Sequence, residues 1–148
     1  MCYLTLLSTT SETDLSINNN ELVKFSTELP GIPEENYLGF KNRWYIGSKS
    51  GCSCDFRHLC SGSIELGFGE PEDWYDEDAN DIEATHQVIA LIRKLVESGE
   101  FVDCIDAWAH GQKEAEPLSG NIEVNLAAIK DSEFRFFEYY RFTFSNKS

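Results

Sequence analysis

The chain lacks the segments by which proteins enter or cross membranes. No apolar run approaches the roughly 18 residues that a membrane-spanning helix needs. The first residues, Met1 to Leu7, have no basic flank, no long apolar stretch and no small-residue cleavage site of the kind that marks a secretory leader. The sequence therefore predicts a protein that spans no membrane and resides in the cytoplasm, where cysteines stay reduced.

Basic residues are also scarce. Lys and Arg together number 12 against 26 Asp and Glu, which gives a formal net charge of −14 at pH 7. An excess of negative charge works against binding to nucleic acid phosphates and to anionic lipid surfaces. We therefore expect neither nucleic acid nor membrane among the partners, and a protein partner should be basic.

Familiar catalytic signatures are missing as well. The sequence contains no HExxH, GxSxG or Walker pattern. Gly67 and Gly69 form a Gly-x-Gly pair, but Glu70 and Pro71 follow it and bring a negative charge and a missing N–H to a place where a phosphate loop needs donors. The sequence therefore favours a non-enzymatic protein without excluding an enzyme.

The residues that are present are sufficient for a globular core. Of the 148 residues 41% are apolar, and the aromatic ones comprise 10 Phe, 6 Tyr and 3 Trp. This composition argues against a disordered chain despite the high charge. The length is typical of one domain, and no linker or internal repeat divides residues 1–148.

The pattern of apolar residues predicts an α+β fold. Asn80 and Glu83 match a capping box, and apolar residues then recur at helical spacing until Gly99, so one main helix is expected at about residues 81–98. A helix over 21–28 competes with one of the predicted strands, and a short helix could occupy 131–138. Alternation predicts six or seven strands, drawn from residues 2–9, 23–29, 44–48, 54–59, 64–68, 101–108, 122–126 and 140–144. We therefore expect a single domain with a largely antiparallel sheet packed on one main helix.

The stretch from Gly51 to Gly62 concentrates reactive side chains. If it is extended, as the second strand of a hairpin with 44–48, one face carries Cys52, Cys54, Phe56, His58 and Cys60. Three thiols and one imidazole are the ligand types of a structural zinc site, but a straight strand would spread them over roughly 26 Å. A shared ion therefore requires the segment to curl, whereas an extended segment makes the cysteines core residues.

Thiol chemistry is a further hypothesis for the same segment. Residues 41–60 contain four basic residues and one acidic residue, Asp55, and nearby cations favour the reactive thiolate. Cys52 and Cys54 could form a strained, easily reduced disulfide. On the predicted strand 101–108 and just after it, Cys104, Asp106 and His110 share one parity, so they could join Cys54, His58 or Cys60 in a site that combines thiol, imidazole and carboxylate.

Residues 70–83 form the most acidic stretch of the chain. They do not match a calcium loop, because Asp81 stands where the loop needs Gly and Gln87 where it needs Glu. The stretch is either a solvated loop or a docking surface for a basic protein. The residues expected to contact such a partner are Glu72, Asp73, Trp74, Tyr75, Asp76, Glu77 and Asp78.

Two functions follow from these patterns. The first is a non-enzymatic interaction protein, similar in kind to small acidic inhibitor or immunity proteins, that binds a basic protein through residues 72–78. The alternative is a metal or redox protein that uses Cys52, Cys54, His58 and Cys60, with Cys104 as a further member and zinc as the candidate metal. The dense aromatic residues between 134 and 144 leave room for a homo-oligomer contact.

Overall fold

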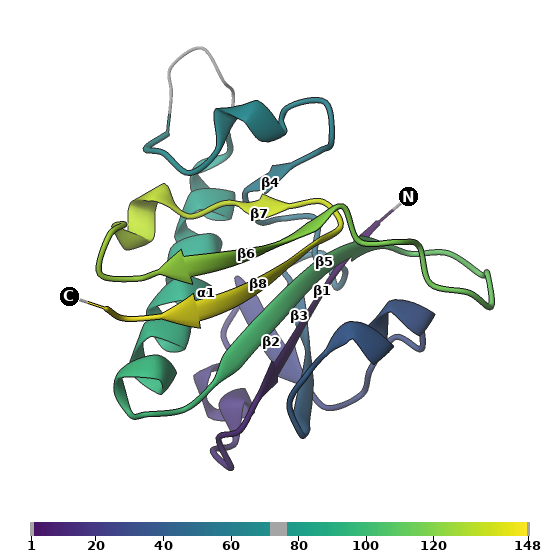
Figure 1. Cartoon of the computed structure of the whole chain (residues 1–148), viewed down its shortest axis with the longest axis horizontal. Helices are drawn as coiled ribbons and strands as arrows, with labels where there is room; N and C mark the ends of the chain where they lie inside the picture. The colour runs from purple at the N-terminus through teal and green to yellow at the C-terminus, as the bar shows by residue number, and fades with distance from the viewer. Residues whose placement is uncertain (1, 72–76, 148) are drawn as a thin grey trace.

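A computed structural model describes residues 2–71 and 77–147 of the chain. It contains a six-stranded sheet in the order β2-β3-β1-β5-β8-β6 (Figure 1). Neighbouring strands are antiparallel except for β6 and β8, which are parallel. The strands are β1 (Tyr3–Thr9), β2 (Val23–Ser26), β3 (Asn42–Ser48), β5 (Val102–Trp108), β6 (Gly120–Asn125) and β8 (Tyr140–Ser145).

One long helix, α1 (Ala79–Glu97), packs across one face of this sheet (Figure 1). The apolar side chains that its periodicity predicts, such as Val88, Ile89 and Ile92, are fully buried. The predicted α+β fold with one main helix is thereby confirmed. The predicted N-cap was wrong, because Asp78 caps the helix by accepting a hydrogen bond from the Asn80 N–H at 2.7 Å and Asn80 is already helical.

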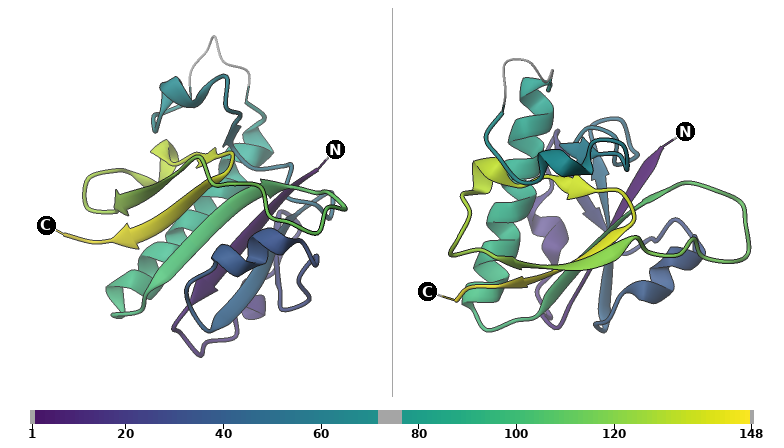
Figure 2. Two further views of the ribbon diagram at one scale, coloured as in Figure 1. Left: turned by 45° about the vertical axis from the view of Figure 1, so that its right-hand side comes forward. Right: turned by 45° about the horizontal axis from the view of Figure 1, so that its top comes forward.

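The other face of the sheet is covered by the segment around the short 3₁₀ helix η2 (Pro33–Tyr37), so the two layers lie on opposite sides (Figure 2). Ile32 and Leu38 from this segment pack against Leu6 and Ile105 of the central strands. Because β1 and β5 are covered on both faces, nearly all of their residues are buried. No helix of the described chain is long and apolar enough to cross a membrane.

Several predicted elements were wrong in length or type. The hairpin partner expected at 54–59 is a series of turns and bends that ends in a two-residue strand, β4 (His58–Leu59), paired in parallel with β7 (Phe136–Phe137). Residues 64–68 and 131–138 contain the short 3₁₀ helices η3 (Ile64–Leu66) and η4 (Asp131–Glu133). The competing helix over 21–28 does not form, because β2 occupies its centre. A fourth 3₁₀ helix, η1 (Leu15–Asn18), precedes β2.

The C-terminal aromatic residues are part of the core. Phe134, Phe136 and Phe142 are fully buried, and Phe137 and Phe144 are at most 7% exposed. Phe134 contacts Phe136 and Phe142 edge-on with ring centroids 5.0 and 5.5 Å apart. These five phenylalanine rings belong to the core cluster that also contains the apolar face of α1, and a homo-oligomer contact stays a prediction.

Candidate thiolate metal site

Three cysteines gather at the end of the sheet where β1 begins. Cys2 precedes β1, and Cys52 and Cys54 lie in the turns after β3. Their sulfur atoms all lie within 4.8 Å of one another. All five cysteines of the chain are free thiols, and these three are partly exposed. Within the described residues, this is the group whose side chains come close enough together to hold a metal ion.

The backbone that holds Cys52 and Cys54 is fixed by a tight turn. The Gly51 N–H donates to the Ser48 carbonyl at 2.9 Å, and the Ser48 N–H donates to the Cys52 carbonyl at 2.7 Å. Gly51 has a φ of +91°, a conformation that residues with a side chain rarely adopt. The Asp55 carboxylate accepts hydrogen bonds from the Ser48 hydroxyl and the Ser50 N–H. These local bonds replace the strand pairing that alternation predicted.

Ser53 attaches this turn to β1. Its N–H donates to the Tyr3 carbonyl at 3.0 Å, and its hydroxyl oxygen accepts from the Thr5 N–H at 2.8 Å. The same hydroxyl donates to the Ile46 carbonyl of β3 at 2.6 Å, and Ser53 is fully buried. Because Ser53 is tied to both strands, the cysteines on either side of it are held beside Cys2.

The thiols of Cys52 and Cys54 differ in acidity. Burial and the neighbouring Cys52 raise the pKa of Cys54 to about 12. Burial also opposes ionisation of Cys52, but hydrogen bonds from the side chain and backbone of Cys54 and from the Cys2 side chain bring the pKa of Cys52 below its usual value. Cys52 therefore becomes a thiolate, the form that binds metals, more readily than Cys54 does.

His58 lies next to this cluster but is bound by other groups. Its Nδ1 lies 2.6 Å from the Asp106 carboxylate, and its Nε2 lies 2.5 Å from the Ser53 carbonyl oxygen. Both partners can only accept, so both nitrogens donate and the ring is an imidazolium. Tyr3 stacks on this ring with centroids 4.0 Å apart, and Trp108 stacks on the other side of Tyr3 at 4.1 Å. With both nitrogens occupied, His58 is neither a metal ligand nor a general base in this arrangement.

The charge of His58 depends on Asp106. Burial alone would lower the pKa of His58, but the Asp106 charge and the hydrogen bonds that the ring donates to Asp106 and to the Ser53 carbonyl raise it above the usual value. The stabilisation from this pair is therefore complete below about pH 6.5, the pKa of an unfolded histidine, and is lost as the pH rises through the higher folded pKa.

Asp106→Asn should remove the charge from His58 at neutral pH. Without the carboxylate, burial becomes the dominant effect and the pKa of His58 should fall below its unfolded value. Nitrogen-15 NMR of the imidazole measures this directly, with a charged ring expected at pH 7 in the wild type and a neutral one in the variant. Asp103→Asn is the matched control, since Asp103 is buried on the same strand but binds Arg141. A neutral His58 in the wild-type protein at pH 7 would contradict the assignment.

The predicted site residues divide into those that gather and those that do not. Cys52 and Cys54 belong to the cluster, whereas His58, Cys60 and Cys104 do not. Cys60 is exposed beside Ser63, and burial raises the pKa of Cys104 far above its usual value in the core. Sequence reasoning missed Cys2, because 50 residues separate it from Cys52 and pairing of strands alone brings them together.

The strand 101–108 does bring one predicted partner to the thiol segment. Asp106 contacts His58, as the shared parity of the two segments allowed. His110 lies elsewhere, with its Nε2 2.8 Å from the buried carboxylate of Glu34. A triad of thiol, imidazole and carboxylate is therefore not assembled, because the second nitrogen of His58 faces the Ser53 carbonyl.

The predicted docking surface at 72–78 is described in part. Glu72, Asp73, Trp74, Tyr75 and Asp76 lie outside the described residues. The Glu77 side chain is 7% exposed and binds two arginines of the interior, and Asp78 caps α1. The Glu77 carboxylate is therefore not available to a partner on the surface.

Arg57 is the centre of that interior ion pair. Its Nε and Nη2 bind the two oxygens of Glu77 at 2.8 and 3.0 Å. Nη1 donates to the carbonyls of Ser132 and Phe134, and Nη2 also donates to that of Gly69. Arg57 is 2% exposed, so one of the four basic residues of 41–60 that were expected to favour the thiolates is instead a structural one.

A cavity of about 300 Å³ opens beside the thiol cluster. Cys54 and His58 line it together with Cys60, Asp78 and Asp81. Burial and the nearby carboxylates of Asp78 and Asp55 raise the pKa of Asp81 to about 6. Carboxylates of Glu77, Asp78 and Asp81 and the positive groups of Arg57 and His58 therefore line the approach to Cys54 from this side.

No protein family, curated protein or solved structure matches the chain.

Proposed function

We propose that the protein binds a thiolate-preferring metal ion, with zinc as the first candidate, through Cys2, Cys52 and Cys54. The observation that supports this proposal is the approach of three sulfur atoms to within 4.8 Å of one another on hydrogen-bonded backbone. Thiolate ligands select zinc and monovalent copper over magnesium and calcium.

The spacing of the sulfur atoms is close to what a metal requires. Zinc–sulfur bonds of about 2.3 Å in a tetrahedron place sulfurs roughly 3.8 Å apart. Since the three sulfurs lie within 4.8 Å, each pair needs to close by at most about 1 Å, which rotation of the side chains can supply. Three protein ligands leave a fourth position for water or another ligand, and the partial exposure of the cysteines allows access to it.

Protons accompany this binding. Cysteine binds metals as thiolate, so a metal replaces the protons of Cys54 and of any other protonated member of the set. The high pKa of Cys54 therefore predicts an affinity that rises with pH across the neutral range. A cytoplasmic location, which keeps the thiols reduced, is part of the proposal.

Metal content and metal titration test the proposal. Protein purified without chelator or nickel affinity should carry close to one equivalent of zinc or copper by elemental analysis. Titration of the metal-free protein with Co²⁺ should give the sulfur-to-cobalt charge-transfer bands of three thiolates, and these bands should disappear on addition of zinc. Metal-free protein that shows no such bands would overturn the proposal.

Binding of a basic protein through residues 72–78 stays a prediction. The net charge of −14 supports it in general terms. This partner contact and the thiol site use different residues, so they can be tested separately. Substitution of Asp76 and Asp78 by Asn should weaken the contact with a basic protein and leave the metal content unchanged.

A further inference from the structure

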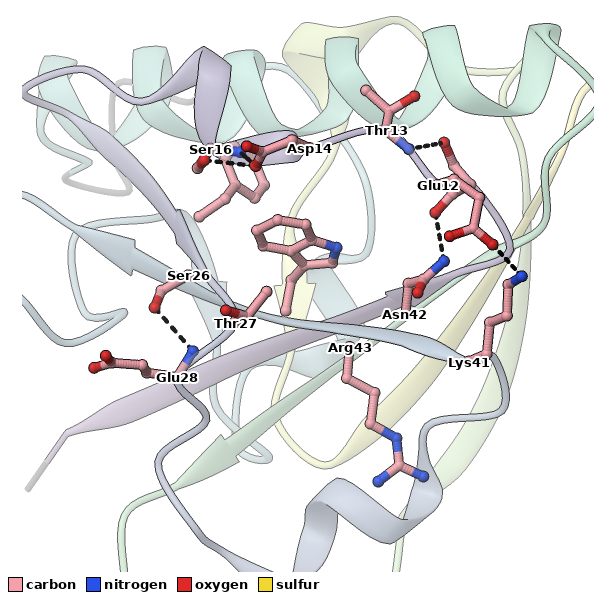
Figure 3. Close-up of a pocket in the computed structure, with 13 residues that line it drawn as sticks. Glu12, Thr13, Asp14, Ser16, Ser26, Thr27, Glu28, Lys41, Asn42 and Arg43 are labelled. Atoms are coloured by element: carbon pink, nitrogen blue, oxygen red, sulfur yellow. Dashed lines mark hydrogen bonds and ion pairs between the residues drawn. The ribbon is translucent and has the colours of Figure 1, made fainter.

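The cavities of the structure differ in whether they give access to a thiol. One of about 590 Å³ lies where β1 ends and β3 begins, and its walls are the segments 11–16, 25–28 and 41–44 (Figure 3). None of the described residues that line it is a cysteine or a histidine. The cavity of about 300 Å³ at the opposite end of the sheet is lined by Cys54 and Cys60. Small reagents that enter this cavity therefore meet thiols, and Cys54 belongs to the metal cluster.

The Cys54 sulfur points towards Cys2. It accepts a hydrogen bond from the Tyr3 N–H, with 3.3 Å between nitrogen and sulfur. Only the Cys2 carbonyl carbon separates this nitrogen from the Cys2 Cα, so the Cys54 sulfur lies within about 6 Å of that Cα. The Cys2 side chain starts from the same Cα, and the two sulfurs lie within 4.8 Å of each other.

These two sulfurs can bond after rotation of their side chains. A disulfide needs about 2.05 Å between its sulfurs, so the pair must close by at most about 2.8 Å. A change of one χ1 rotamer moves a cysteine sulfur by roughly 3 Å. The Ser53 N–H donates to the Tyr3 carbonyl at 3.0 Å, so the backbone holds the two residues side by side while the side chains turn.

Cys52 is a less suitable partner for either sulfur. A bond between Cys52 and Cys54 would close a small ring around Ser53, which is fully buried and bonded to both β1 and β3. Such a ring departs from ordinary disulfide geometry and is strained. Cys52 also lies within 4.8 Å of Cys2, but it is not among the described residues that line the cavity of 300 Å³. A reagent in that cavity therefore meets Cys54 first.

We infer that oxidation switches the metal site off, because a peroxide converts Cys2 and Cys54 into a disulfide and thereby removes two of the three metal ligands. The loss of metal rests on the proposed function, whereas the disulfide depends only on the approach of the sulfurs. Metals bind cysteine as thiolate, and a sulfur in a disulfide is no longer one.

Hydrogen peroxide supplies the oxidising equivalents. One thiol attacks an oxygen of the peroxide, the O–O bond breaks, and a sulfenic acid and one water form. The other thiol attacks the sulfenic sulfur, so that the S–S bond forms, the S–O bond breaks and a second water leaves. The two thiols have then given two electrons and two protons to the peroxide. In the metal-bound protein the same two protons come from solvent.

Peptide mapping after oxidation tests the disulfide. Reduced, metal-free protein is treated with hydrogen peroxide, its remaining thiols are blocked with N-ethylmaleimide, and it is digested with trypsin. Trypsin cleaves after Lys24, Lys49 and Arg57, so the disulfide joins the peptide that ends at Lys24 to peptide 50–57. This joined peptide should be the main oxidised product and should disappear on treatment with a phosphine reductant. Absence of the joined peptide, or a disulfide confined to 50–57, would overturn the inference.

Single variants identify the partner of Cys2. The joined peptide should form in Cys52→Ser and in Cys60→Ser, and it should be lost in Cys54→Ser. Cys60→Ser is the matched control, since Cys60 lines the same cavity but lies outside the cluster. Fragmentation of the wild-type joined peptide between residues 52 and 54 gives the same assignment even if a variant does not fold. A bond from Cys2 to Cys52 would contradict the proposed pair.

Zinc titration before and after oxidation separates the inference from the proposed function. The oxidised protein should bind zinc at least about 100-fold more weakly than the reduced protein, and the phosphine should restore the affinity. Equal affinity in the two forms would overturn the inference, and the proposed function would stand. A joined peptide from a protein that binds no zinc when reduced would support the disulfide and overturn the proposed function.

Discussion

Replacing Arg57 by methionine is expected to lower the free energy of unfolding by about 3–5 kcal/mol. The substitution removes one partner of a buried ion pair and leaves the Glu77 carboxylate with a single, more distant arginine, Arg135 at 3.4 Å. It also removes the donors to three backbone carbonyls, those of Gly69, Ser132 and Phe134. For a domain of this size the expected fall in Tm is roughly 6–20 °C. Urea unfolding followed by circular dichroism measures the change.

Lys147→Met is the matched control for Arg57→Met. Lys147 also pairs with a carboxylate, that of Glu123 at 2.9 Å, but its side chain is 71% exposed. Solvent screens a pair this exposed, so it contributes little to stability. An equal loss of stability in the two variants would contradict the prediction. It would mean that the buried network around Arg57 does not hold β4, the segment after it and the start of α1 together.

Replacing Cys2 by serine is expected to weaken metal binding by about 100-fold or more. Loss of a residue that supports a metal ligand commonly costs 10-fold to 100-fold in affinity, and loss of the ligand itself should cost at least the upper value. At a metal concentration 100 times the wild-type Kd, binding stabilises the wild type by about 2.7 kcal/mol and the variant by about 0.4 kcal/mol. Thermal unfolding with and without zinc measures this difference.

The variant Cys60→Ser distinguishes the three-cysteine cluster from the ligand set that the sequence predicted. The Cys60 thiol is exposed and lies outside the group of three, so its replacement should leave the zinc-dependent stability unchanged. Had the ion been bound by Cys52, Cys54, His58 and Cys60, the Cys60→Ser variant would lose the zinc-dependent stabilisation and the Cys2→Ser variant would keep it. A zinc effect lost in Cys60→Ser but kept in Cys2→Ser would contradict the site described above.

Elements with strong local periodicity could be predicted from the sequence. The helix α1 and the strands β1, β3, β5, β6 and β8 carry apolar residues in patterns that favour their own type of element. The structure that the local sequence favours is therefore the one that the packed core requires. The segment 54–59 alternates as regularly, yet it forms turns and bends. Asp55 in this segment and Ser53 just before it bind backbone and side-chain groups nearby, and Arg57 turns into the interior towards Glu77. No alternation rule includes these contacts.

The sequence predicted the type of ligand in the candidate site, the cysteine thiol, but not which three cysteines form it. The cysteine-rich segment drew attention to Cys52 and Cys54, whereas Cys2 is placed beside them by the attachment of the 49–54 turn to β1. Strand pairing at long range has no local signal in one sequence. For the same reason the sequence left the contact between His58 and Asp106 as one of several possible pairings, and it gave no sign of the cavity beside Trp44, whose walls come from three separate segments.

The central position of β1 also sets the order in which the protein can assemble. Strand β1 leaves the ribosome first, yet its two neighbours arrive about 41 and 105 residues later, as the pairs Thr5↔Ile46 and Tyr3↔Trp108 require. Pairings of such large separation slow folding, because each closes a long loop before it gains contacts. The turn that carries Cys52 and Cys54 follows β3 directly, so β1, β3 and this turn can meet while β5 and β8 have yet to be synthesised. A metal ion bound at that stage would hold the first strand in place until the second half of the sheet is made.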